Sequence, residues 1–318
     1  MNPVIPNHRP AATWPTLELD QWRDSYATLH MWTQIVGKTR LALAPMENHW
    51  WQVVLYLTPR GLTTSPMPAG ERTFAVDFDF IDHGLHLRVS DGATATVRLA
   101  PRSVADFHAA YMDALRSLDI DVRIRPVPVE VATAIPFAED HEHASYDADA
   151  AHRCWQVMVH ADRVLKRFRG LFQGKASPVH FFWGAFDLCT TRFSGRRAPL
   201  HPGGVPNCPD YVMEEGYSHE CSSCGFWPGG GAVDEPAFYA YAYPEPAGYG
   251  EGDPGPAGAY YHPELREFIL PYETVRTAAS PDDVLMEFLQ GSYALAADLG
   301  HWDRAALERA SDARSVAP

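Results

Sequence analysis

The chain has 318 residues, of which 46% are hydrophobic and 21% charged, so it is long enough for a large core or two domains. Its 40 acidic residues outnumber 26 basic ones, and the resulting net charge of −14 argues against nucleic acid and membranes as partners. No apolar run approaches the roughly 20 residues that cross a bilayer, and residues 1–15 lack the apolar segment of a secretory signal. A cytoplasmic location is therefore expected.

The first half predicts a helix, a sheet and a second helix. Apolar and aromatic residues recur every three or four positions from Leu19 to Ala44, which is typical of an amphipathic helix. Short β-rich runs follow at 49–58, 74–81, 85–89 and 96–99, with Asp-His-Gly and Asp-Gly turn signals after the second and third. A second amphipathic helix is predicted at 103–118. Residues 121–131 are expected to be an extended strand or linker.

The second half is predicted to repeat this order. A helix capped by Asp147 or Asp149 leads into a strand at 180–188, and further strands at 237–243 and 267–271 precede a terminal helix at 281–299. In each half a helix histidine precedes a strand histidine, by 19 residues in the first and 20 in the second. The predicted fold class is α+β, a tandem duplication of a helix, antiparallel meander sheet and helix unit with pseudo-twofold symmetry. The two repeats are placed at residues 1–134 and 135–318.

A segment near residues 196–236 has no counterpart in the first half. Loops of this length in a compact domain are usually functional or disordered. The segment concentrates His219, two cysteines and Trp227 within a few residues, which is not typical of disorder. We expect its centre to be ordered and packed onto the core. Residues 244–258, rich in Gly, Pro and Ala, are expected to form an exposed flexible loop.

Six stretches of the chain are long enough to be specific. They are Leu-His-Met-Trp-Thr-Gln at 29–34, Asn-His-Trp-Trp at 48–51, Arg-Gly-Leu-Thr-Thr-Ser at 60–65, Pro-Val-His-Phe-Phe-Trp-Gly at 178–184, Arg-Phe-Ser-Gly-Arg at 192–196 and Cys-Gly-Phe-Trp-Pro-Gly at 224–229. Together they resemble an uncharacterised bacterial family, domain-of-unknown-function family 5996. The resemblance covers nearly the whole chain and implies no particular activity.

The histidines suggest a metal site. Neutral imidazole is the commonest protein metal ligand, and His49 and His180 each open an aromatic run. If the long segment brings His219 and Glu220 to the same pocket, histidines and a carboxylate could hold one divalent ion, iron or zinc, with positions left open for substrate. The alternative for each histidine is a hydrogen bond to nearby backbone.

The five cysteines are an odd number in a chain without an export signal, so thiols or ligands are expected rather than disulfides. Cys208, His219, Cys221 and Cys224 could form a structural zinc site, although their spacing differs from that of the familiar zinc modules. The Cys-Ser-Ser-Cys run at 221–224 could be a redox pair, but such pairs normally open a helix.

One face of the strand at 237–243 carries tyrosines at alternate positions. The plain interpretation is a sheet with one wet side, and the functional one is a tyrosine-lined pocket. The residues expected to serve a site are Glu220, Asp187 and Tyr241 as catalytic groups, Trp183, Tyr239, Trp227 and Arg192 for substrate, and His180, His219 and His49 for metal.

The function expected from these patterns is a metal-dependent enzyme, a mononuclear oxidoreductase or hydrolase, acting on a small molecule in a cavity between the two repeats. No phosphate-binding loop, dinucleotide fingerprint or Gly-x-Ser-x-Gly elbow is present, so no nucleotide cofactor is expected. The alternative is a non-catalytic binding protein with an aromatic-lined cavity for an apolar or aromatic ligand.

Overall fold

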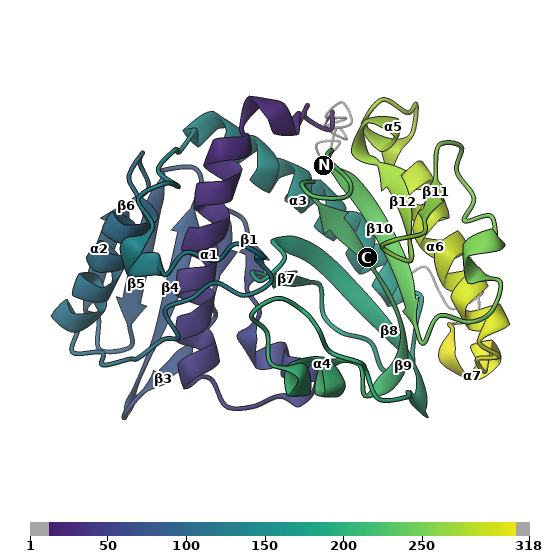
Figure 1. Ribbon diagram of the computed structural model, residues 1–318, viewed down its shortest axis with the longest axis horizontal. Helices are drawn as coiled ribbons and strands as arrows, with labels where there is room; N and C mark the ends of the chain where they lie inside the picture. Colours follow the sequence, from purple (N-terminus) through teal and green to yellow (C-terminus); the bar gives the residue numbers. More distant parts are fainter. Residues whose placement is uncertain (1–12, 310–318) are drawn as a thin grey trace, which may run out of the picture.

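The computed structural model describes residues 13–309. They form two antiparallel sheets of six strands each, with helices around and between them (Figure 1). The fold is therefore mixed α+β, in agreement with the alternation of helix and strand periods along the sequence.

The first sheet follows the predicted meander. Its strands run in the order β1-β2-β4-β5-β6, with β3 paired to β4. The predicted turns at 82–84 and 91–92 connect β4 to β5 and β5 to β6. The buried side chains of this sheet pack in one core with those of α1 (Arg23–Leu43) and α2 (Val104–Ser117). The strands are β1 (Tyr56–Thr58), β2 (Gly61–Thr63), β3 (Met67–Ala69), β4 (Arg72–Asp79), β5 (Gly84–Val89) and β6 (Thr94–Arg98).

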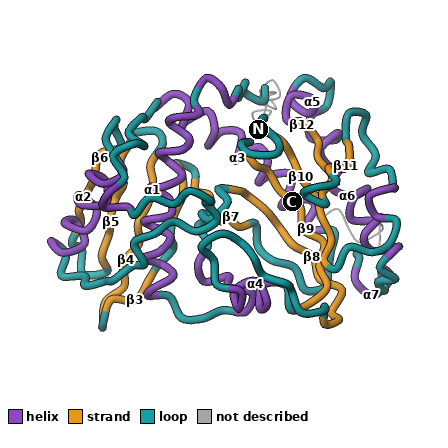
Figure 2. The backbone as a smooth tube through the Cα atoms, viewed as in Figure 1, coloured by secondary structure: helices purple, strands orange, loops and turns teal. Residues whose placement is uncertain are grey.

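The second sheet runs in the order β11-β12-β10-β9-β8-β7 (Figure 2). Helices α3 (Ala148–Gly170) and α6 (Pro281–Leu299) pack on one of its faces, where Leu188, Phe226 and Phe238 are buried. The other face holds the candidate site. The strands are β7 (His180–Phe182), β8 (Asp187–Arg197), β9 (His219–Trp227), β10 (Ala237–Tyr243), β11 (Tyr260–His262) and β12 (Glu267–Pro271).

The edges of the two sheets meet beside α1. Leu55, just before β1, and Phe181 in β7 exchange two backbone hydrogen bonds of 2.9 Å and are both fully buried. Helix α1 also packs closely on the turn after β7, because a Cβ on Gly37 would lie 2.3 Å from the indole of Trp183. One hydrophobic core consequently includes residues of both sheets.

Local signals set several element ends. Ser103 accepts a hydrogen bond from the backbone N–H of Asp106 at 3.0 Å, and Asp147 accepts one from Ala150 at 2.9 Å, so both cap the helices that follow. The strand at 237–243, the strand at 267–271 and the helix at 281–299 have the predicted bounds. The short elements are η1 (Leu19–Gln21), η2 (Asn48–Val53), η3 (Phe137–Glu139), η4 (Tyr249–Glu251), α4 (Asp210–Gly216), α5 (Tyr272–Arg276) and α7 (Arg304–Leu307).

Two of the predicted strands are wrong in extent. In the first, residues 48–53 form the irregular helix η2, where His49 and Trp50 have φ of 59° and 61°, and only 56–58 are a strand. The second, predicted at 180–188, is folded back on itself as the antiparallel pair β7 and β8 around a turn that includes Phe186 with φ of 58°. Aromatic residues favour strands, but β propensity depends on context, and in these two segments the tertiary structure overrides it.

The predicted long loop at 196–236 is also corrected. It contains α4 and the whole of β9, which lies inside the second sheet and pairs with both β8 and β10. Its centre is therefore ordered and packed onto the core, as expected. The region 244–258 is less exposed than predicted, because Tyr249 in η4 is fully buried.

Candidate functional site

A hydrogen-bonded pair of an aspartate and a tyrosine lies on the face of the second sheet that is not covered by α3 and α6. The hydroxyl of Tyr239 in β10 donates to the carboxylate of Asp187 in β8. The ring of Tyr239 stacks on that of Tyr241 with 6.1 Å between centroids, and the Tyr241 hydroxyl lies 2.8 Å from the hydroxyl of Tyr217. Three residues predicted for the site, Asp187, Tyr239 and Tyr241, are thus brought together.

Asp187 is an unusual carboxyl in electrostatic terms. It is 8% exposed, and burial raises its pKa to about 6, although the hydrogen bond from Tyr239 acts in the opposite direction. Within residues 13–309 no basic side chain forms an ion pair with it. At neutral pH this carboxylate is therefore an uncompensated buried charge, close to its point of protonation.

Two further carboxyl groups are close enough to feel the charge of Asp187. Burial and that charge raise the pKa of Glu130 to about 7 and the pKa of Glu267 to about 8. Yet the side chain of Glu130 is exposed and that of Glu267 is half-buried. Water therefore reaches both carboxyls, which share a region of the surface with Asp187.

We call the group formed by Asp187, Glu130, Glu267, Tyr26, Tyr239 and Tyr241 the acidic recess. Tyr26, on α1, belongs to it because burial and the charge of Asp187 raise its pKa although its side chain is only half-buried. The side chain of Trp227, predicted to bind substrate, lies beside the Tyr26 hydroxyl and lowers that pKa.

One face of helix α1 carries a stripe of polar residues, which begins with Tyr26 of the acidic recess. Tyr26, His30, Gln34 and Lys38 are four residues apart and therefore share one helix face. Nε2 of His30 lies 2.8 Å from the carbonyl oxygen of Gly184. Burial lowers the pKa of His30 to about 4, so the ring is neutral at pH 7 and Nε2 donates to that carbonyl.

The same stripe holds the segment that carries Glu130. The side chain of Gln34 donates to the carbonyl of Val129 at 2.9 Å and accepts from its N–H at 2.8 Å. Glu130 itself has φ of 59°, and a Cβ on Gly184 would lie 2.0 Å from its carboxylate oxygen. Glycine at 184 therefore lets the carboxyl of Glu130 approach the turn between β7 and β8.

Part of the inserted segment lies against residues 125–131, which form no strand. The N–H of Glu130 donates to the carbonyl of Pro206 at 2.8 Å, and the Asn207 amide donates to the carbonyl of Val131 at 2.9 Å. Arg125 donates to the carbonyl of Asn207 at 3.2 Å. Three hydrogen bonds therefore attach residues 206–207 to residues 125–131 at the side of the acidic recess.

The three histidines predicted to bind metal do not converge on one point. Nδ1 of His49 contacts the carbonyl of Gly216 at 2.9 Å, and its Nε2 lies 2.7 Å from Nζ of Lys175. His219 stands beside His49, with 5.7 Å between ring centroids. His180 is 1% exposed and is packed among aromatic rings, with neither ring nitrogen hydrogen-bonded and its pKa lowered to about 3 by burial. Between residues 13 and 309 no group of three or more His, Cys, Asp or Glu side chains is arranged to hold a metal ion.

The remaining predicted residues are spread over other parts of the fold. Glu220 accepts hydrogen bonds from Ser194 and Arg196, both at 2.8 Å, and as the neighbour of His219 in β9 it points to the opposite face. Arg192 is 1% exposed and stacks over the ring of Phe168, with 3.4 Å from its guanidinium carbon to the centroid, on the helix-covered face. Trp183 is buried between the sheets, where its Nε1 donates to the carbonyl of Val53 at 2.7 Å.

Sequence reasoning missed Tyr26, Glu130 and Glu267 as members of the site. Tyr26 could have been found, because the hydrogen-bonding residues Tyr26, His30, Gln34 and Lys38 recur at every fourth position of the helix and this spacing is visible in the sequence. Glu130 and Glu267 carry no such signal. They reach the acidic recess through the path of the 121–131 segment and through the pairing of β12 with β10.

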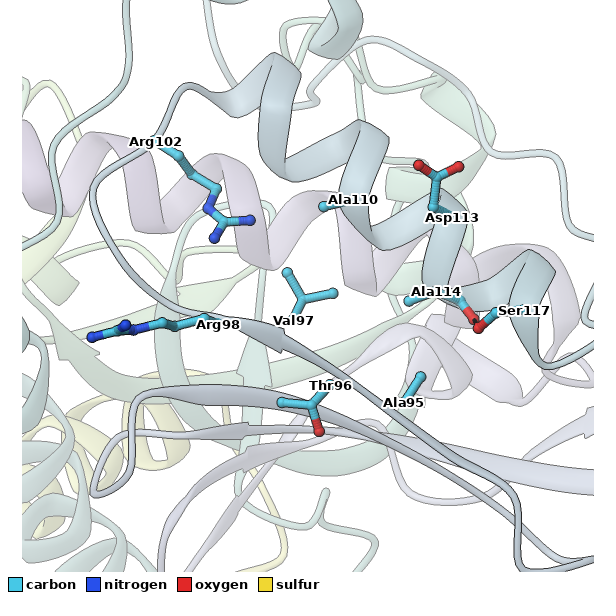
Figure 3. Close-up of a pocket in the computed structure, with 9 residues that line it drawn as sticks. All are labelled: Ala95, Thr96, Val97, Arg98, Arg102, Ala110, Asp113, Ala114 and Ser117. Carbon is cyan, nitrogen blue, oxygen red and sulfur yellow. Dashed lines mark hydrogen bonds between the residues drawn. The ribbon is translucent and has the colours of Figure 1, made fainter.

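A separate surface hollow lies between β6 and α2 (Figure 3). Arg98 and Arg102 stand at one end of it, Asp113 and Ser117 at the other, and alanines and Val97 lie between them. The hollow is open to solvent and contains none of the perturbed titratable groups described above. The acidic recess is therefore the stronger candidate site.

Comparisons with known proteins place the chain in one family only. A family model described as a family of unknown function, DUF5996, matches residues 14–309. No curated protein and no solved structure matches the chain. Among the described helices, none is long and apolar enough to cross a membrane.

Proposed function

The chain belongs to the DUF5996 family, whose function is unknown, and from its own residues we propose that it is an enzyme that binds a small molecule in the acidic recess and transfers a proton through Asp187 and Tyr239. The observation that carries this proposal is a buried carboxyl with a pKa near 6 that is hydrogen-bonded to a tyrosine and forms no ion pair with a basic side chain of residues 13–309. Desolvated groups of this kind cluster at functional sites.

The raised pKa suits general acid and base chemistry. Proton transfer is most efficient when the pKa of the group lies near the working pH, because both protonation states are then populated. Asp187 would take a proton from the substrate or return one to it. Tyr239, which donates to the same carboxylate, would hold the group in one orientation.

The other groups of the acidic recess would position the ligand. The faces of Tyr26, Tyr239 and Tyr241 offer apolar contact area, and their hydroxyls offer a few directed hydrogen bonds. At pH 7 Asp187 is mostly ionised, Glu130 is about half ionised and Glu267 is mostly protonated, so the net charge of the three is negative. None of the three carboxyls forms an ion pair with a basic side chain of residues 13–309. The recess therefore disfavours anionic ligands and favours neutral or cationic ones.

The metal-dependent mechanism expected from the sequence is not part of this proposal, because the donor atoms of His49, His180 and His219 do not point to a common centre. The non-catalytic alternative uses the same tyrosines and differs in one respect. In a binding protein, replacing Asp187 would change the affinity for the ligand, and there would be no catalytic turnover to lose.

The proposal can be tested with a thermal-shift screen of small molecules against four proteins. They are the wild type, Asp187→Asn, Tyr239→Phe and the control Asp77→Asn, which makes the same chemical change on the first sheet. Neutral or cationic hits should raise the melting temperature of the wild type and the control, each relative to its own ligand-free value. Asp187→Asn and Tyr239→Phe should lose most of that shift.

Turnover is then measured for each hit by proton NMR in D₂O. The expected result is exchange or conversion at a substrate carbon by the wild type, reduced at least 100-fold by Asp187→Asn. Hits that stabilise all four proteins equally would show that the ligand binds elsewhere. Hits that bind in the recess without conversion would favour the non-catalytic alternative.

We also propose that the two halves arose by duplication. In support, each half contains a helix, a six-stranded antiparallel sheet and a further helix, in that order. The strand orders differ, however, because the second sheet places β10 between β12 and β9. The pseudo-twofold symmetry and the boundary between residues 134 and 135 belong to this proposal.

A further inference from the structure

Lys38 is the one lysine of three that is buried. The others, Lys166 and Lys175, are on the surface, where Lys166 pairs with Asp162 at 2.7 Å. Lys38 is 1% exposed, and within residues 13–309 its Nζ has no hydrogen-bond partner. Nζ stands 5.5 Å from the ring centroid of Trp183. It occupies the last position of the polar stripe on α1, one turn after Gln34.

A buried ammonium without a partner is costly, and the cost shifts the group toward its neutral form. Burial, together with the nearby charge of Arg125, lowers the pKa of Lys38 to about 8. The amine is then neutral in about one molecule in ten at pH 7, against fewer than about one in a thousand for an ordinary lysine. A desolvated lysine beside another cation is a recognised form of activated nucleophile.

The groups that face Lys38 come from two segments. Arg125 belongs to the 121–131 segment, and its charge lowers the pKa of Lys38. Cys208 belongs to the inserted segment, and burial raises the pKa of its thiol, so the thiol is neutral at pH 7 and supplies no counter-charge. No carboxylate among the described residues forms an ion pair with Nζ.

We propose that Lys38 is a nucleophilic lysine that forms a Schiff base with an uncharged aldehyde or ketone. The Nζ without a hydrogen-bond partner among residues 13–309, its place at the end of the polar stripe and its position over the indole ring of Trp183 carry the proposal. An uncharged carbonyl compound also fits the neighbouring acidic recess, which disfavours anions. The inference goes beyond the proposed proton transfer and does not require it.

The chemistry needs no further reactant. The lone pair of Nζ forms a bond to the carbonyl carbon, and the carbonyl oxygen gains a proton from the nitrogen to give a carbinolamine. The hydroxyl then leaves with the second amine proton as water, and a carbon–nitrogen double bond remains. Because Lys38 is 1% exposed, access requires local movement. The inserted segment is the part tested for this movement, because its Cys208 lies close enough to Lys38 to affect the pKa of the amine and its Asn207 amide donates to the carbonyl of Val131.

The test is reductive labelling of the full chain with propanal and cyanoborohydride at pH 7, followed by digestion and mass spectrometry of each lysine peptide. Lys166 and Lys175 are internal references on the same chain. We expect Lys38 to be alkylated at least 10-fold faster than either of them although it is buried. Its rate should rise through a midpoint near pH 8, because only the neutral amine reacts.

Three variants complete the design. Lys38→Arg should remove the fast phase, and Lys175→Arg should leave it unchanged. Asn207→Ala removes one bond of the covering segment and should increase the rate at Lys38 by several-fold. A rate at Lys38 below those of both surface lysines, in the wild type and in Asn207→Ala alike, would show that the residue is structural. The readout involves neither Asp187 nor the ligand screen, so this proposal and the proposed function can fail separately.

Discussion

The titratable side chains of the acidic recess lie in positions that lower the stability of the fold. Asp187 is nine-tenths buried with only a tyrosine hydroxyl as partner, and its charge raises the pKa of Glu130 and Glu267. A buried charge without a counter-ion destabilises a fold. Such residues are retained in proteins where they serve a function, and the stability that they cost can be recovered by mutation.

Replacing Asp187 with asparagine should therefore stabilise the protein at neutral pH. The folded-state pKa of about 6 lies above 3.8, the ordinary pKa of an aspartate, so the folded state binds more protons than the unfolded state between these pH values. The charge of Asp187 does not lower the free energy of unfolding below about pH 4. Its destabilising effect grows as the pH rises and reaches its full size above about pH 6. A shift of this size corresponds to roughly 3 kcal/mol.

The measurement is the free energy of unfolding of wild type and Asp187→Asn by urea at several pH values. The variant should be more stable by on the order of 1–3 kcal/mol at pH 7.5, and the difference should vanish near pH 4. A variant that is less stable than the wild type at pH 7.5 would contradict the electrostatic account of this carboxyl.

At the scale of a single element, strand β9 positions Tyr239 relative to Asp187. Cys224 in β9 pairs with Thr190 of β8 on one side and with Ala240 of β10 on the other, so β9 determines the register in which Asp187 meets Tyr239. Glycine at 225 leaves room for this contact, because a Cβ there would lie 2.4 Å from the carbonyl oxygen of Leu188 and 2.7 Å from the Tyr239 hydroxyl.

Gly225→Ala should accordingly destabilise the protein by roughly 1–3 kcal/mol, as overpacking does in a close-packed interior. It should also displace Tyr239 from Asp187. The matched control is Gly170→Ala at the end of α3, where a Cβ would meet nothing within 4 Å and where alanine favours the helix. Chemical denaturation checks the stabilities. Equal effects of the two substitutions would contradict the close packing at position 225.

Helix α1 shows how one element serves both structure and site. Trp32 on one side of the helix is fully buried and stacks on Phe107 of α2, with 4.6 Å between centroids. The other side carries the polar stripe that contacts the turn after β7. Because this helix contacts the core of the first sheet and the edge of the second, the position of the stripe relative to the acidic recess is fixed by packing.

At the scale of the whole molecule, the core is continuous across both sheets. It includes Trp32 on α1, Phe181 at the junction of the sheets and Phe238 in the second sheet. We therefore expect one cooperative thermal transition by calorimetry, with equal calorimetric and van't Hoff enthalpies. Two separated transitions would show instead that residues 1–134 and 135–318 unfold as independent domains.

The sequence by itself determined the element types and many of their ends. Periodicity identified α1, α2, α3 and α6. Of the two predicted caps for α3, Asp147 and Asp149, the structure shows Asp147, and a cap of this kind can be read from the sequence because it acts within three residues of itself. Alternation placed Tyr239 and Tyr241 on one strand face for the same reason. Strand β9 was not predicted from the sequence, and only its formation in the structure separates His219 from Glu220, which were expected to share a pocket.

Only the tertiary structure decided which distant residues meet. The path of the 121–131 segment brings Glu130 to Gly184, and strand pairing across 52 residues brings Asp187 to Tyr239. The same packing kept the predicted metal histidines apart and buried Lys38 without a partner. Local patterns record the preference of a chain for helix or strand within a few residues. Burial, and the pKa shifts that follow from it, depend on all the protein around a group, and so they exist only once the sheets and helices have packed together.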